Sequence, residues 1–226
     1  MLIFRTILLA LLLSVALVPQ VVFAQDIDIN LQPKYGSLPK NDALKKADAN
    51  FLAAIDKQYK GDRKKAAEDF ALRGWQFLHE GNYLDAMRRF NQAWLLDSSN
   101  GHALWGMAAF ETMIGEFDAS LKLFAEAERS ILDDINFSVD YAKSMGLAGA
   151  QTKNEALLKD AFARFARIYE NTPQNTLNLE NWGTTLFLVG DYAEAWKKVK
   201  LVEAIPGHAD LDPRFLKALQ SKMPRP

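Results

Sequence analysis

The feature that most constrains the fold is a glycine-x-aromatic triplet that recurs along the chain. The three triplets are Gly81-Asn82-Tyr83, Gly115-Glu116-Phe117 and Gly190-Asp191-Tyr192. The first two begin about 34 residues apart, a spacing that indicates supersecondary units stacked on one another. The third follows after two further periods of this length and a short insertion.

Each triplet lies between two stretches with a helical pattern. Glycine reaches the left-handed conformation without a Cβ clash, so it ends the first helix, and the aromatic residue opens the second. After the first triplet, Ala86, Phe90 and Ala93 recur every three to four residues, which marks one helix face. Neither helix buries its apolar face alone, so we expect an all-α fold of stacked antiparallel helix pairs.

The spacing within each unit resembles the tetratricopeptide repeat family, whose signature is W-x2-L-G-x2-Y, then A-x3-F, then P. The first unit has Gly74 followed by Ala86 and Phe90, and the last unit has Gly183. The resemblance implies a right-handed α-solenoid with a terminal capping helix at each end, and a concave face that binds other proteins. Three residues depart from the pattern, namely Arg73, Glu111 and Ser120.

Residues 1–24 predict export. Arg5 precedes an apolar run from Ile7 to Val18, Pro19 ends that run, and Val22-Phe23-Ala24 precedes the expected cleavage point. This order is typical of a secretory signal peptide, so we expect a periplasmic or secreted protein. The alternative is an uncleaved N-terminus that anchors the chain in a membrane.

One helical domain is expected at residues 42–222, after a linker at residues 25–41 that contains Pro33, Gly36 and Pro39. Apolar and polar residues alternate at positions 27–31, which predicts either an extended segment along the helices or disorder near the terminus. We expect repeats at about 67–100, 101–134, 135–175 and 176–206, and capping helices at about 42–60 and 213–222.

Polar residues mark the expected helix starts. Asp42, Asp62 and Asp212 are predicted N-caps. The third unit is longer than the others and has no triplet, and its motif Thr152-Lys153-Asn154-Glu155 fits a capping box. A helix is therefore expected to begin near the second residue of that motif. The additional length of this unit predicts longer helices or a protruding turn around Gly149.

Composition and motifs argue against several classes of function. The chain has 27 basic and 28 acidic residues, so it carries no strong positive field for nucleic acid. It has no cysteine and none of the common nucleotide-binding or hydrolase motifs. His79 and His102 are expected about 16 Å apart along parallel helices, too far to share a metal. We therefore expect no enzyme, no cofactor and no metal.

The resemblance also places a partner-binding surface on the first helices of successive repeats. Trp75 lies on the stripe beside the expected core stripe of Phe70, Gly74 and Phe77, and it is predicted to face Ala109 of the next repeat. The alternative is that the tryptophans only seal the repeat interface. The predicted surface comprises Ala71, Trp75, Leu78, His79, His102, Trp105, Ala109, Thr112, Met113, Lys143, Glu180, Thr184 and Phe187.

These features favour an exported module that binds a peptide or partner protein on its concave face. A structural scaffold of the cell envelope, anchored by an uncleaved N-terminus, is the alternative. A small-ligand binder or an enzyme fits the sequence least well.

Overall fold

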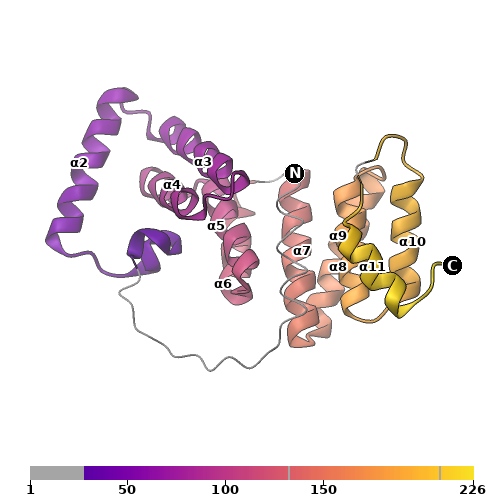
Figure 1. Cartoon of the computed structure of the whole chain (residues 1–226). Helices are drawn as coiled ribbons and strands as arrows, with labels where there is room; N and C mark the ends of the chain where they lie inside the picture. Colours follow the sequence, from indigo (N-terminus) through magenta and orange to yellow (C-terminus); the bar gives the residue numbers. More distant parts are fainter. Residues whose placement is uncertain (1–27, 132, 209) are drawn as a thin grey trace. The chain divides into compact units, whose positions relative to one another are not determined.

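The computed structural model describes residues 28–131, 133–208 and 210–226. The predicted signal peptide and the first three linker residues lie outside these ranges. Within them, the regular secondary structure consists of ten α-helices and two short 3-10 helices, with no strand (Figure 1). The expected all-α fold is confirmed.

Consecutive helices pack as antiparallel pairs, as the recurring triplet predicted. The pairs are α3 with α4, α5 with α6, α7 with α8, and α9 with α10, while α2 precedes them and α11 follows (Figure 1). The bounds are η2 Ile29–Leu31, η3 Pro33–Ser37, α2 Asp42–Gln58, α3 Arg63–His79, α4 Tyr83–Leu96, α5 Gly101–Ile114, α6 Phe117–Ala127, α7 Ile135–Thr152, α8 Glu155–Asn171, α9 Thr176–Leu188, α10 Tyr192–Glu203 and α11 Pro213–Lys222.

The chain forms two compact units. Among the described residues, unit 1 comprises 28–115 and 122–131, and unit 2 comprises 116–121, 133–208 and 210–226. Unit 1 therefore contains helices α2 to α5 and the C-terminal part of α6. Unit 2 contains the start of α6 and helices α7 to α11.

The predicted glycine turns are present in the three pairs that carry the triplet. Gly81, Gly115 and Gly190 have φ angles of 77°, 85° and 86°, between the two helices of their pairs. Only glycine reaches this region without a Cβ penalty, so the triplet fixes the turn locally. Side-chain caps complete the helix starts, and Asp62 and Asp212 act as N-caps as predicted. At α2, however, the cap is Asn41 and not the predicted Asp42, which is the first helical residue.

The third pair differs from its prediction at the turn. Thr152 does not cap α8, because it is the last residue of α7 and its Oγ1 donates to the carbonyl oxygen of Ala148. Lys153 takes the left-handed conformation, and Asn154 is the N-cap. The additional length of this unit extends the helices to 18 and 17 residues. No turn forms at Gly149, which is buried within α7. A Cβ added to Gly149 would lie only 2.8 Å from Leu158 Cγ on α8, so the two helices approach closely at this glycine.

The core of unit 1 is organised around Phe90 on α4, whose side chain is completely buried. A Cβ added to Gly74 on α3 or to Gly106 on α5 would lie 2.5 Å or 2.2 Å from the Phe90 ring. Both glycines are therefore required for three helices to approach one phenylalanine. The predicted contact residue Ala86 is also completely buried, as expected where α3 and α4 cross closely.

Residues 28–40 are neither an extended strand nor without structure, contrary to the two alternatives for the linker. They form η2 and η3, and Lys34, Tyr35, Gly36 and Ser37 all have positive φ angles of 54–67°. A left-handed conformation costs a residue with a Cβ roughly 1–2 kcal/mol. Tertiary contacts must therefore hold this turn, and they come from the α4 side chain Asn91.

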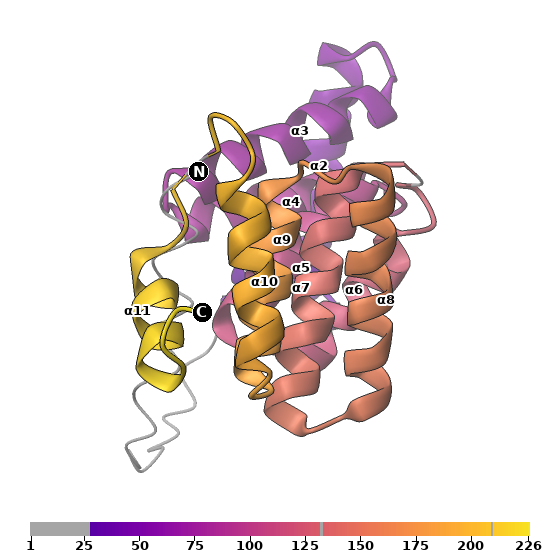
Figure 2. The ribbon, with the colours of Figure 1, turned by 90° about the vertical axis from the view of Figure 1, so that its right-hand side faces the viewer.

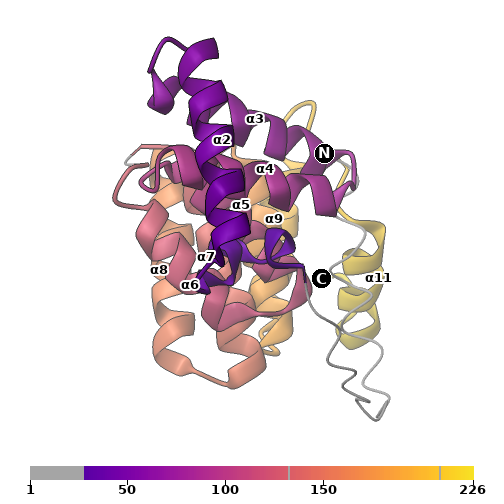
Figure 3. The ribbon, with the colours of Figure 1, turned by 90° about the vertical axis from the view of Figure 1, so that its left-hand side faces the viewer.

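Helix α2 is the outermost helix of unit 1 and packs loosely (Figures 1 and 3). Ile55 is its one buried residue, and Phe51, Leu52 and Tyr59 are partly buried against α3. The ring of Phe51 meets that of Phe70 edge-on at 5.6 Å. No other described residue of α2 is buried, so its first half contributes little to the core.

In unit 2, helices α7, α8, α9 and α10 lie side by side, with α11 next to α10 (Figure 2). A Cβ on Gly146 of α7 would lie 2.5 Å from Thr185 Oγ1 of α9, so these two helices approach closely. Phe215 and Leu219 of α11 are buried, and Trp196 Nε1 donates to the carbonyl oxygen of Met223 at 3.1 Å. The predicted final helix therefore forms and is firmly packed.

Candidate functional site on helices α3 and α5

The centre of the candidate site is a pair of tryptophans from neighbouring helices of unit 1. The rings of Trp75 on α3 and Trp105 on α5 meet edge-to-face, with centroids 4.6 Å apart. Trp75 Nε1 donates to the carbonyl oxygen of His102 at 3.1 Å, which fixes the orientation of its ring. Trp105 is 9% exposed, whereas Trp75 is only partly buried. Trp75 is therefore partly exposed to solvent while its ring is held in place.

Three more rings surround this pair. The Phe90 ring lies 5.8 Å from that of Trp75 and supports it from the core. His79 lies 6.0 Å from the Trp75 ring, and His102 lies 6.2 Å from the Trp105 ring. Together these five residues form what we call the tryptophan cluster. Each additional aromatic contact contributes about 0.5–1.5 kcal/mol beyond area burial, so the cluster is a rigid platform.

A polar contact closes one side of the tryptophan cluster. Glu68 Oε1 lies 2.8 Å from His102 Nδ1, and Asn100 Nδ2 donates to Glu68 Oε2 at 3.1 Å. Asn100 is at the same time the N-cap of α5. Glu68 therefore ties α3 to the start of α5 and holds His102 beside the tryptophans.

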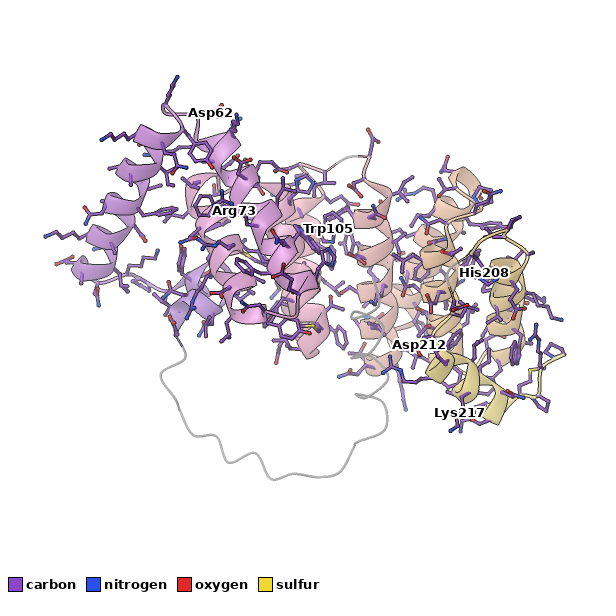
Figure 4. The ribbon with its side chains drawn as sticks, turned by 45° about the horizontal axis from the view of Figure 1, so that its top comes forward. Asp62, Arg73, Trp105, His208, Asp212 and Lys217 are labelled. Carbon is purple, nitrogen blue, oxygen red and sulfur yellow. The ribbon has the colours of Figure 1, made fainter. Side chains whose placement is uncertain are left out.

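The exposed rim of the site lies on α3. Leu72 is 55% exposed and His79 is also exposed, and both lie on the same helix face as Trp75, at spacings of three and four residues. Arg73 follows Leu72 on α3. Figure 4 labels Arg73 on α3 and Trp105 on the neighbouring helix α5. An exposed leucine on the same helix face as a partly exposed, fixed tryptophan suits an apolar ligand group better than chemistry on a substrate.

The unit 1 residues predicted to bind a partner differ in accessibility. Ala71, Leu78, Trp105, Ala109 and Thr112 are buried. Trp75, His102 and Met113 are partly buried, and His79 is exposed. The two tryptophan rings contact each other, whereas the prediction had Trp75 facing Ala109.

The core stripe of α3 is rotated relative to its prediction. Leu78 is only 1% exposed, whereas Phe77, which was expected in the core, is partly exposed. The buried stripe runs through Phe70, Ala71, Gly74 and Leu78.

Two of the four unit 2 residues of the predicted surface, Glu180 and Phe187, contact the C-terminal part of the same chain. Glu180 is 7% exposed, and its Oε1 accepts a hydrogen bond from Asp212 N at 2.9 Å. The Phe187 ring lies 6.1 Å from that of Phe215 on α11. Thr184 is buried and Lys143 is partly buried.

Sequence reasoning did not identify Glu68, Leu72 or Asn91. One signal for Glu68 was available, because it lies one repeat period before His102 and so takes the same position in its repeat. Asn91 lies within a helix pattern and looked like a solvated residue. Its role depends on a segment 56–61 residues away, which no local pattern reveals.

Three further findings concern metal binding, membrane spanning and similarity to known proteins. No group of three or more His, Cys, Asp or Glu side chains among them is arranged to hold a metal ion. Within the described ranges, no helix has the length and apolar character needed to span a bilayer. No protein-family model, no curated protein and no solved structure matches the chain.

Proposed function

We propose that this chain is an exported protein-interaction module of the tetratricopeptide repeat type, a right-handed α-solenoid that binds a peptide or partner protein. The recurring triplet, the antiparallel helix pairs and the N-terminal sequence support this proposal. The module acts in the periplasm or after secretion and uses no cofactor.

The observation that carries the proposal is the partly exposed side chain of Trp75, which is held in place by Trp105, Phe90 and the His102 carbonyl. Large aromatic residues in fixed positions are the side chains on which protein interfaces most often depend. Because the ring is already ordered, a ligand loses little side-chain entropy in docking against it. Leu72 extends the apolar surface by one helix turn.

The partner contributes an apolar side chain that lies on Leu72 and Trp75, with His79 at the rim. A binding role suits these residues better than catalysis. His102 is engaged with Glu68 through Nδ1, and its other neighbour is a tryptophan ring, so it contacts no nucleophile in the tryptophan cluster.

The test begins with affinity capture of the partner from the cell envelope by the chain without residues 1–24. Binding of the purified partner is then measured for Leu72→Gln and for its matched control Leu84→Gln. The two leucines are 55% and 56% exposed on helices of the same unit, so each change removes a similar exposed apolar side chain without adding charge.

We expect Leu72→Gln to weaken binding by about tenfold, equivalent to about 1.4 kcal/mol, and Leu84→Gln to leave it unchanged. Both variants should melt like the native chain. Equal affinity of the two variants for the partner would remove the tryptophan cluster as the binding surface. Trp75→Ala is a second test, read together with thermal stability, because that ring also packs on Phe90.

A further inference from the structure

Residues 28–40 lie on the outside of α4 as a bound peptide would. The buried side chain of Asn91 makes three hydrogen bonds to their backbone. Its Nδ2 donates to the carbonyl oxygens of Asn30 at 2.9 Å and Gln32 at 2.8 Å, and its Oδ1 accepts from Tyr35 N at 3.3 Å. One side-chain amide thus recognises a peptide by its main chain.

Side chains of the segment fill positions around this clamp. Tyr35 is 6% exposed and lies 6.4 Å from the Trp94 ring, and burial raises the pKa of its hydroxyl. Lys40 Nζ lies 3.5 Å from the centroid of the Tyr35 ring. Lys34 forms an ion pair with Glu126 on α6. We call Asn91, Trp94 and Glu126 the Asn91 site.

The connection between this segment and the rest of unit 1 is weak. It continues into α2, where only Ile55 is buried, and α2 joins α3 through Lys60 and Gly61. Both have positive φ angles, of 54° and 84°. Lys60 has a Cβ and is therefore strained there. Straightening these two residues would release residues 28–58 from their own unit while leaving α3 to α6 in place.

We propose that the Asn91 site is a peptide-binding site whose second ligand is residues 28–40 of another copy of this chain. Two copies exchange their N-terminal segments, with the turn at Lys60 and Gly61 opening as the hinge. Every contact that the segment makes within one chain re-forms between the two chains, which makes exchange a low-cost route to a dimer. The positive φ at Lys60 is relieved in the exchanged form.

Engineered cysteines test this exchange directly, because the native chain has none. Lys34→Cys and Glu126→Cys are made on separate full-length chains, since these two side chains are in contact. The variants are mixed, refolded together at low and at high protein concentration, and treated with a short bismaleimide cross-linker. Lys34→Cys mixed with Lys217→Cys, an exposed position on α11, measures random collisions.

We expect a covalent heterodimer of Lys34→Cys and Glu126→Cys whose yield rises with concentration and exceeds that of the collision control at least tenfold. A yield no higher than the control at the highest concentration overturns the proposal. The result is independent of the proposed function, because Leu72→Gln in both chains, which should weaken partner binding without lowering stability, should leave the yield unchanged.

The role of Asn91 has its own comparison. Asn91→Ala, introduced into the Glu126→Cys chain, removes all three bonds to the segment and should lower the heterodimer yield to the level of the collision control. The neighbouring change Gln92→Ala should not lower the yield, because Gln92 Oε1 accepts its hydrogen bond from Arg89 of the same helix. If Asn91→Ala retained the native yield while its circular dichroism stayed helical, Asn91 would not be the clamp.

Discussion

Helices α2 and α11 are the first and last α-helices of the described residues, and they differ in how firmly they pack against their neighbours. Helix α11 has 10 residues and buries Phe215 and Leu219, which are 1% and 0% exposed. Helix α2 has 17 residues and buries only Ile55. The longer helix therefore contributes fewer buried side chains.

The polar contacts differ in the same direction. The start of helix α11 is joined to α9 by a buried hydrogen bond from Asp212 N to Glu180 Oε1. Helix α2 is joined to α3 by an exposed ion pair between Asp56 and Arg63. A buried bond lost without replacement costs about 1–3 kcal/mol, whereas an exposed ion pair is screened by water and contributes little.

The two terminal helices pack differently because the neighbouring helices, α9 and α3, leave different amounts of their surface for them to bury. On α9, the face that carries Glu180 and Phe187 is completed by contacts from Asp212 and Phe215 of the C-terminal segment. On α3, the buried stripe is already occupied by α4 and α5, and only its first turns remain for α2. An amphipathic pattern thus predicts that a terminal helix forms, but not how firmly it packs.

The largest expected effect comes from truncating the aromatic anchor of each terminal helix. Phe215→Ala should lower the free energy of unfolding by about 3–5 kcal/mol, the range for a fully buried phenylalanine. Phe51→Ala should lower it by only about 1–2 kcal/mol, because that ring is partly exposed and removes less apolar area from water. Urea unfolding followed by circular dichroism measures both. Equal losses would erase the contrast between α2 and α11.

The next prediction compares a substitution in the α3–α4 pair with one on α2, and the expected loss of stability is smaller. We expect the stability of unit 1 to depend on the α3–α4 pair and not on α2. Ala86 is completely buried on α4, so Ala86→Leu should overpack the pair and cost about 1–3 kcal/mol. The matched change Ala53→Leu lies on the exposed face of α2 and should stay within about 0.5 kcal/mol of the native chain. An unchanged melting temperature for Ala86→Leu would contradict the packing of this pair.

The helices themselves were predictable because their ends are encoded locally. Asp62 and Asp212 cap their helices through their own side chains, and Gly81 turns the chain through its own backbone. The predicted capping box at Thr152 was wrong, although Thr152 and Glu155 have the spacing of that motif. Lys153 takes the left-handed conformation there, and Asn154 is the better-placed cap.

The candidate site was predictable only in part. Periodicity placed Trp75 and Trp105 on neighbouring helices, but it did not predict that their rings touch or that Leu72 is the exposed apolar residue beside them. A rotation of α3 by a fraction of a turn exchanges Phe77 for Leu78 in the core. The pattern of apolar residues is compatible with either orientation of the helix. The left-handed turn at Tyr35 depends on Asn91, far away in the sequence, and no local rule predicts it.

The smallest expected effect concerns the ion pair that joins α2 to α3. Arg63 donates to Asp56 through two bonds of 2.7 Å, and these bonds hold the pKa of the Asp56 carboxyl below its ordinary value of 3.8. A carboxyl whose pKa is lower in the folded state contributes stability above the unfolded pKa, and that contribution is lost as the pH falls through the folded pKa.

Helix α2 should therefore loosen below about pH 4. Hydrogen–deuterium exchange of residues 42–58, corrected for the intrinsic rate, should rise between about pH 5 and about pH 3 in the native chain. In Asp56→Asn, which has no charge to lose at this position, exchange of α2 should already be faster at the higher pH and should change less between the two. Residues 213–222 should show no such difference between the two chains, because the contacts of α11 do not involve Asp56. An equal rise in both chains would mean that this ion pair does not hold α2, and that α2 is held by its other contacts with α3, which include Phe51, Leu52, Ile55 and Tyr59.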